Sequence, residues 1–221
     1  MCEAGGTRTA SARARRVPQS SGASPAQPPI PIECERLLVE RARTEPAAFA
    51  ELYDRHVGRL YAYALRCLGD RMAAEDIVAE TFQRAIEYLP RYQWRGVPFR
   101  AWLYRIASNA IAGCARRTPM IPIEEAPDIA DDAPGPEDVA LRRERRQTVL
   151  AAIATLPLSQ RQVVLLRYAE DLPHRDIAHA IGRSEGAVKV LLHRAQRTLY
   201  KQLAAGSPGQ ELRAASPRGA S

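Results

Sequence analysis

The stretch Arg91–Arg117, RYQWRGVPFRAWLYRIASNAIAGCARR, decides how this chain folds because it combines positive charge, aromatic rings and a helical period. It holds six arginines, both tryptophans and five aromatic residues in all, and it contains no Asp or Glu. Arginine neutralises phosphates, and an aromatic ring gives an unpaired base a stacking face worth roughly 1 to 3 kcal/mol. The stretch is therefore typical of a surface for a polyanion with exposed bases.

The same stretch also predicts a buried helix face. From Phe99 onward its apolar residues recur at helical spacing, so some of the aromatic rings must serve a core. These residues are Phe99, Trp102, Leu103, Ile106, Ala110, Ile111 and Cys114. Tyr92, Trp94 and Arg95 precede the periodic run, and we expect them to be exposed in a loop. The sequence thus predicts a helix with its core on one face and nucleic acid on the other.

The composition and charge of the whole chain agree with a nucleic-acid partner. Of its 221 residues 26% are charged and 46% are hydrophobic, which is enough apolar surface for packed cores. Arginines outnumber lysines by 30 to 2, and arginine favours planar, bidentate contacts with phosphate and guanine. The net charge is +3 for residues 1–32, +3 for 33–117, −7 for 118–138 and +7 for 139–205. Two basic bodies therefore flank one acidic strip.

Composition also predicts the domain organisation. Residues 1–32 lack aromatic residues and are expected to form a disordered basic arm, and residues 206–221 a disordered tail. Residues 118–138 hold seven acidic residues, five prolines and no basic residue, which indicates a flexible linker. We therefore expect an all-α protein with two small helical domains, at 33–117 and 139–205.

In the first domain the pattern predicts three helices that pack as a bundle. The first starts at Glu45-Pro46 and ends at Gly69, Asp70 caps the second, and Pro90 ends it. The inward set of the second helix includes Ile77, Val78, Thr81, Phe82, Ala85, Ile86 and Leu89. Its other face is acidic, which either keeps the domain soluble or docks a basic partner protein.

The second domain has the parts of a helix-turn-helix. Ser159 and Gln162 have the spacing of a capping box, Pro173 opens a short helix through Ala180, and Gly182 marks a turn before a helix from Glu185 toward Leu203. The outward residues of this last helix suit the major groove. They are Glu185, Gly186, Lys189, His193, Gln196, Arg197 and Tyr200.

The cysteines and the hydropathy bear on metal binding, membrane insertion and cellular location. Cys2, Cys34, Cys67 and Cys114 show no paired spacing and no His at metal-binding distance, so we expect reduced thiols, no metal and no cofactor. No apolar run approaches the roughly 18 residues of a membrane span, and residues 1–32 lack the apolar region of a signal peptide. We expect a cytoplasmic protein without membrane insertion.

Three motifs in this order resemble those of bacterial sigma factors of the extracytoplasmic-function (ECF) group of the sigma-70 family. AEDIVAETF lies at residues 74–82 and WLYRIASN at 102–109, and DIA, GAVK and HRA follow between 176 and 195. The resemblance covers about residues 45–117, similar to region 2 of these factors, and 139–203, similar to region 4. It implies a factor that directs RNA polymerase to promoters and needs no catalytic group.

The resemblance also implies a set of contacts for each partner. The contacts with core RNA polymerase would be to the clamp helices of its largest subunit, made by Asp70, Glu75, Asp76, Ile77, Glu80 and Phe82. The flap of core polymerase would be a second contact. Tyr92, Trp94, Arg95, Trp102, Arg105, Asn109, Arg116 and Arg117 would open and read the minus-10 element. Arg183, Ser184, Glu185, Gly186, Lys189, His193, Arg194 and Arg197 would bind the minus-35 element. An anti-sigma factor is the further partner that the resemblance implies.

Two other classes of protein remain as alternatives at this point. A helix-turn-helix regulator whose first bundle senses or dimerises would explain residues 139–203, but not the acid-free aromatic stretch. A DNA-processing enzyme would need metal-binding carboxylates or a positioned nucleophile. Glu75, Asp76 and Glu80 have no catalytic partner in the pattern, so an enzyme is not expected.

Overall fold

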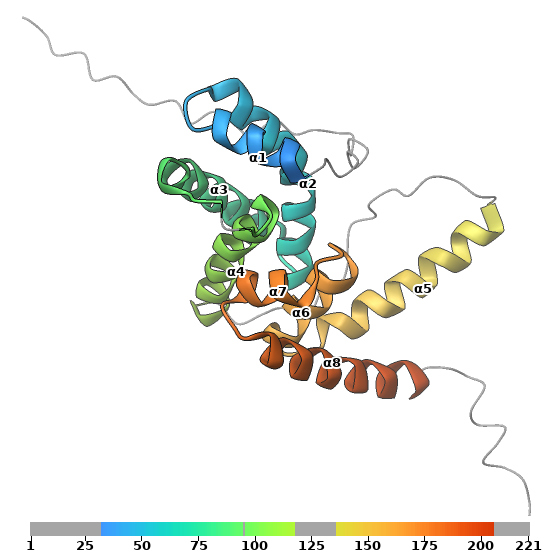
Figure 1. The fold of residues 1–221 in the computed structure, drawn as a ribbon. Helices are drawn as coiled ribbons and strands as arrows, with labels where there is room; N and C mark the ends of the chain where they lie inside the picture. The colour runs from blue at the N-terminus through green and yellow to red at the C-terminus, as the bar shows by residue number, and fades with distance from the viewer. Residues whose placement is uncertain (1–31, 95, 118–135, 206–221) are drawn as a thin grey trace, which may run out of the picture.

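The structure is a computed structural model that describes residues 32–94, 96–117 and 136–205, with backbone alone at 32, 136–143 and 205. Within these ranges every regular element is helical, as Figure 1 shows. The elements are α1 (Ile32–Arg41), α2 (Pro46–Leu68), α3 (Arg71–Tyr88), the 3-10 turn η1 (Leu89–Arg91), α4 (Phe99–Arg117), α5 (Pro136–Ala154), α6 (Leu158–Tyr168), α7 (His174–Ile181) and α8 (Glu185–Ala205). The all-α class is confirmed. In the described part of the chain, no helix is long and apolar enough to cross a membrane.

Helices α1–α4 form the first group, and the boundary between α2 and α3 follows the predicted signals. Pro46 begins α2, where its missing N–H costs nothing. Gly69 ends α2 with a φ of 79°, a left-handed conformation that glycine adopts without a steric penalty. The Asp70 carboxylate then accepts a hydrogen bond of 2.7 Å from the Ala73 N–H and caps α3, as predicted.

Helix α1 is the element that the sequence pattern missed. It buries Leu38 and Val39 and lies along α2, with further contacts to the start of α4. The sequence pattern predicts the first helix only from Glu45-Pro46, because the ten residues of α1 are too short a run for a helical period to be distinguished. The predicted disordered arm, residues 1–32, lies outside the described residues except for Ile32.

Helices α5–α8 form the second group, and here one predicted cap is wrong. Helix α6 starts one residue before Ser159, its N-cap is Pro157, and no side chain caps it. Ser159 therefore lies inside the first turn and forms no capping box with Gln162. Helix α5 begins at Pro136, inside the segment predicted as linker; residues 118–135 lie outside the described part.

The two groups share one continuous core and pack closely against each other. Helix α4 lies along α7, and α2 contacts α6 (Figure 1). The buried Arg161 of α6 donates a hydrogen bond of 2.6 Å to the Cys67 carbonyl at the end of α2. Gln162 reaches the Ser108 carbonyl of α4 at 3.5 Å. Backbone carbonyls of the first group are thus satisfied by side chains of the second.

Candidate nucleic-acid interface

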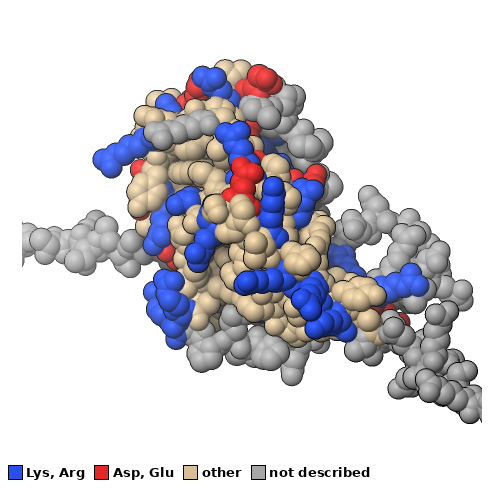
Figure 2. Space-filling model, turned by 60° about the horizontal axis from the view of Figure 1, so that its bottom comes forward, with Lys and Arg blue, Asp and Glu red and all other residues tan. Residues whose placement is uncertain are grey.

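One face of α8 is exposed and rich in polar groups. The inner face buries Val188, Leu192 and Ala195 in the core. The eight residues predicted to bind the minus-35 element are all exposed: Arg183, Ser184, Glu185, Gly186, Lys189, His193, Arg194 and Arg197. Figure 2 turns this side of the molecule forward and shows many Lys and Arg side chains with few acidic ones. The surface has the charge and the helical form that fit a major groove.

The turn before α8 fixes the direction in which this helix leaves the domain. Gly182 has a φ of 65°, as its predicted place in a tight turn requires, and the Arg183 N–H bonds the Ala178 carbonyl at 3.0 Å. The Ser184 hydroxyl accepts a hydrogen bond of 3.2 Å from the Ala187 N–H and caps α8. Ser184, predicted as a DNA contact, therefore also stabilises the start of the recognition helix.

The second candidate surface lies at the start of α4, and here the predicted exposure of Tyr92 is wrong. Only 9% of Tyr92 is exposed. Its ring packs against Trp102, with centroids 4.8 Å apart, against Phe99 at 6.0 Å and against Trp94 at 6.5 Å. The contacts with Phe99 and Trp94 are edge-to-face, an arrangement that stabilises rings beyond the area they bury, and this explains why Tyr92 turns inward from its loop.

The two tryptophans of this aromatic cluster keep part of their surface exposed. Trp102 packs against Phe99 at 5.3 Å between ring centroids and against the core, yet it is only partly buried. The structure thus gives Trp102 a packing role without removing it from the surface. Arg95 lies outside the described residues.

Farther along α4, the remaining predicted residues are exposed but lie beside the second group of helices. The Arg105 guanidinium donates a hydrogen bond of 2.8 Å to the His179 carbonyl at the end of α7. Asn109 and Arg116 line a hollow of about 450 Å³, and Arg183 lines the same hollow from the other side. The structure therefore brings residues of the two predicted DNA surfaces together, while Arg117 remains exposed at the end of α4.

Buried carboxyl groups lie along the contact between the two groups. Burial raises the pKa of Glu170, although a hydrogen bond from Tyr104 and nearby arginines partly offset this. Burial also raises the pKa of Asp176 against the charges of Arg100 and Arg175. Because burial raises both pKa values, these carboxyls contribute most to the stability of the packed arrangement when they are protonated. This contribution is lost as the pH rises through their raised pKa values.

Helix α3 carries the predicted polymerase-binding surface. Asp70, Glu75 and Asp76 are exposed, and Glu80 is partly exposed and pairs with Arg84 at 2.6 Å. Two of the predicted contacts, Ile77 and Phe82, are instead buried in the core. They pack α3 against the other helices and are not part of its exposed surface.

The outer face of α3 also holds apolar side chains that sequence reasoning missed. Met72, Ile86 and Tyr88 are all more than half exposed. Ile86 was predicted to point inward, and that prediction is wrong. Single apolar residues on a polar helix face give no periodic signal, so only the structure could reveal this group.

The thiols and possible metal ligands add no reactive group to these surfaces. Burial raises the pKa of Cys67 to about 12, so its thiol is protonated and inert at neutral pH. Among the described residues, Cys34 is exposed and unpaired, and no group of three or more His, Cys, Asp or Glu could hold a metal ion.

Comparison with known families and proteins is consistent with these surfaces. Residues 52–118 match the family description Sigma-70 region 2, and residues 146–199 match Sigma-70, region 4. The chain is 35% identical to the ECF RNA polymerase sigma factor BldN of Streptomyces coelicolor over 75% of this chain and 64% of BldN, less than two thirds of that relative. It is 32% identical to the ECF sigma factor SigW of Bacillus subtilis over 71% of this chain and 89% of SigW. The structure of CnrH in complex with the cytosolic domain of CnrY is similar with a TM-score of 0.58 and 27% identity, over 78% of this chain and 99% of that one.

Proposed function

The chain belongs to the ECF sigma factors of the sigma-70 family, and we propose that it directs core RNA polymerase to specific promoters and starts transcription there. One observation supports this most directly. A single chain carries both an exposed recognition helix and, at the start of α4, a partly exposed aromatic cluster within a stretch of sequence that has no Asp or Glu. A helix-turn-helix regulator needs only the first of these surfaces.

The minus-35 element binds α8 in this proposal. Lys189 and Arg197 lie on its exposed face and contact phosphate or guanine, and small Gly186 permits close approach. The other exposed residues named above complete the contact with the groove and the flanking backbone. The rigid turn at Gly182 keeps the helix in one orientation toward the duplex.

The minus-10 element binds the start of α4 as a single strand. Trp94 and Trp102 offer partly exposed rings for stacking, and Arg105, Asn109, Arg116 and Arg117 lie along the same helix. A pocket that holds an extruded base offsets the few kcal/mol that unstacking costs. Buried Tyr92 supports the two tryptophan rings from behind rather than stacking on a base.

The exposed face of α3 binds core polymerase through the clamp helices of its largest subunit, and the flap is a second contact. Glu75 and Asp76 supply charge, while exposed Met72 and Ile86 supply apolar area at the same face. An anti-sigma factor is proposed as a further protein partner. The complex of the similar CnrH with a domain of another protein supports such a partner.

Promoter binding requires the two helical groups to separate. The minus-35 and minus-10 elements are about 25 base pairs apart, which is about 85 Å along straight duplex at 3.4 Å per pair. In this structure, residues of both surfaces line one hollow, and Arg105 contacts the helix-turn-helix directly. The packed arrangement therefore belongs to the protein before it engages DNA.

A run-off transcription assay tests the proposed function. Purified chain and core polymerase are incubated with a pool of templates randomised at both promoter elements, and transcripts are selected and sequenced. We expect transcripts from a defined promoter sequence. A helix-turn-helix regulator gives none unless another sigma factor is added, so a blank result with active core overturns the proposal.

A further inference from the structure

Two side chains from the N-terminal helix and its following turn hold the two ends of the loop that precedes α4. At one end, a Glu35 carboxylate oxygen accepts a hydrogen bond of 3.3 Å from the Phe99 N–H, the first residue of α4. At the other end, the Arg43 guanidinium donates to the Tyr92 carbonyl. Both residues precede residue 52, where the match to region 2 begins. Neither was among the residues predicted to act on DNA.

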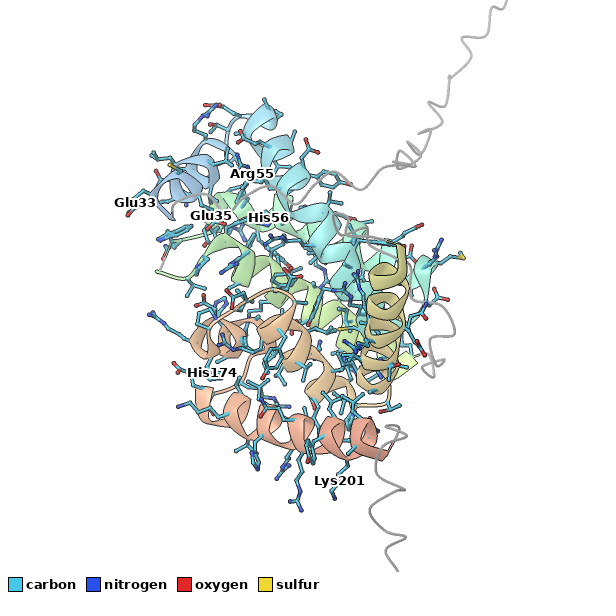
Figure 3. The ribbon with its side chains drawn as sticks, turned by 90° about the vertical axis from the view of Figure 1, so that its right-hand side faces the viewer. Glu33, Glu35, Arg55, His56, His174 and Lys201 are labelled. Carbon is cyan, nitrogen blue, oxygen red and sulfur yellow. The ribbon has the colours of Figure 1, made fainter. Side chains whose placement is uncertain are left out.

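Glu35 is buried although its side chain is ionisable, which indicates a specific task. Only 8% of the residue is exposed, and burial raises the pKa of its carboxyl while the Phe99 N–H and the Arg100 charge act against this rise. A buried carboxylate is costly unless hydrogen bonds satisfy it. Figure 3 shows Glu35 beside His56 and Arg55, with Glu33 of the same helix on the outside.

The attachment of α1 to the domain does not depend on this carboxylate. Leu38 and Val39 bury the apolar face of α1 against the core. An N–H at the first turn of a helix has no partner within the helix, and negative charge is favourable there. The bond therefore fixes where α4 begins, and the Arg43 bond fixes where the loop begins.

We propose that Glu35 and Arg43 are positioning residues that fix the backbone at Phe99 and at Tyr92, on either side of the connection that precedes α4, so that Trp94 and Trp102 keep the separation needed to receive a minus-10 base. This inference rests on the proposed function and adds two residues and a mechanism to it. Nearby, the Tyr92 hydroxyl donates a weak hydrogen bond of 3.4 Å to the Val97 carbonyl, and the Tyr92 ring packs against Trp94 and Trp102. Preorganisation of this kind lowers the entropy cost of binding a flexible strand.

The test uses holoenzyme and a promoter recovered from the randomised pool. Glu35→Leu removes the acceptor, Glu35→Gln keeps a neutral acceptor in the same shape, and Arg43→Met removes the donor at the other end. Glu33→Gln and Arg41→Met are matched controls, because both residues are exposed on the same helix. Binding of a fluorescent single-stranded minus-10 oligonucleotide is measured beside binding of minus-35 duplex, affinity for core polymerase, and thermal melting.

We expect Glu35→Leu and Arg43→Met to weaken binding of the single strand about tenfold, the effect of losing one hydrogen bond to a charged group. Minus-35 binding and affinity for core polymerase should stay at the wild-type level in both variants. Glu35→Gln should bind the single strand nearly as well as wild type does. The inference is overturned if both variants bind the single strand like wild type, or if every readout falls together. Arg43→Met decides the question if Glu35→Leu fails to fold, because Arg43 lies at the surface. Failure of wild-type holoenzyme to bind the oligonucleotide would instead refute the proposed function.

Discussion

The two DNA-facing helices, α8 and α4, differ in how freely the molecule presents them. Every predicted contact on α8 is exposed, and its inner face alone belongs to the core. Around α4 the predicted contacts differ: the Tyr92 ring in the preceding loop is buried, Trp94 and Trp102 are partly buried, and Arg105 is bonded to the other helical group. Asn109, Arg116 and Arg117 are exposed. The contact face of α8 is therefore accessible as it stands, whereas much of the contact surface at α4 is packed against the rest of the fold.

This difference follows from what each helix is proposed to bind. Duplex DNA presents its base edges in a groove, so an exposed helix face is enough to read them. A single strand must first be unstacked, and its base needs a shaped pocket, which only packed and anchored side chains can form. We therefore expect substitutions on α4 to affect folding and opening together, and substitutions on α8 to affect binding alone.

The largest effect is expected where α4 enters the core. Phe99 is fully buried, and Phe99→Ala should lower the free energy of unfolding by about 3 to 5 kcal/mol because it removes a large ring and leaves a cavity. Urea denaturation measures this loss. The control Tyr200→Ala alters an exposed ring on α8 and should change the free energy by less than about 0.5 kcal/mol. Equal losses in the two variants would remove the contrast between the helices.

A pH dependence should also distinguish the region around α4. Burial and the charges of Arg59, Arg100 and Arg55 lower the pKa of His56 to about 4. His56 is thus neutral in the folded state at neutral pH. Its contribution to the free energy of unfolding is complete when the pH is above its ordinary pKa of about 6.5, and it is lost as the pH falls toward 4. The full loss is about 3 kcal/mol.

Denaturation series at pH 7 and pH 4 test the His56 effect. His56→Gln should remove this part of the slope, whereas His193→Gln, at an exposed position of α8, should leave it unchanged. Neighbouring Glu35 has a raised pKa and acts in the opposite direction, so the difference between variant and wild type is the quantity to compare. An unchanged slope in His56→Gln would show that this histidine does not sense the pH.

Trp102→Ala tests the proposed base contact. The variant should open promoters roughly 10- to 100-fold less well, which corresponds to a stacking contribution of about 1 to 3 kcal/mol. Permanganate reactivity of unpaired thymines measures opening, and binding of minus-35 duplex serves as the control. Equal opening by the variant and wild type would leave Trp102 with its packing role alone.

The sequence predicted the features that local chemistry determines. Asp70 as a cap, Gly69 as the end of a helix, Gly182 as a tight turn and the exposed face of α8 all follow from residue type and spacing. Features that depend on contacts between distant segments were missed: the burial of Tyr92, the bond of Glu35 to Phe99 and the packing of α4 against α7. A helical period shows which side of a helix is apolar, but not which other element covers it.

Lys189→Ala should have a smaller effect, confined to the duplex. Lys189 is exposed on the outer face of α8, so the variant should weaken minus-35 binding several-fold and reduce the slope of log affinity against log salt by about one. Fluorescence anisotropy at several salt concentrations measures both. Binding of the single-stranded minus-10 oligonucleotide should not change, and a loss there would contradict the separation of the two surfaces.

The smallest effect concerns Arg105, which joins the two surfaces. The closed arrangement gains about 1 kcal/mol from its hydrogen bond to the His179 carbonyl, so Arg105→Ala should shift the balance between closed and open forms about fivefold. Energy transfer between dyes on the two helical groups measures this shift. One dye is placed on exposed Cys34 and the other on Tyr200→Cys in a chain that carries Cys2→Ser and Cys114→Ser, and buried Cys67 does not react.

Arg116→Ala is the matched control for Arg105→Ala. Arg116 is an exposed arginine of the same helix that lines the same hollow, so its removal subtracts an equal charge without removing the bond to His179. We expect lower energy transfer for Arg105→Ala alone. If both variants open the molecule equally, the positive charge of these arginines attracts the other helical group, and α4 is held there by charge in general rather than by the specific bond to His179. If neither does, the shared core alone keeps the two groups together, and polymerase or DNA must supply the free energy that separates them.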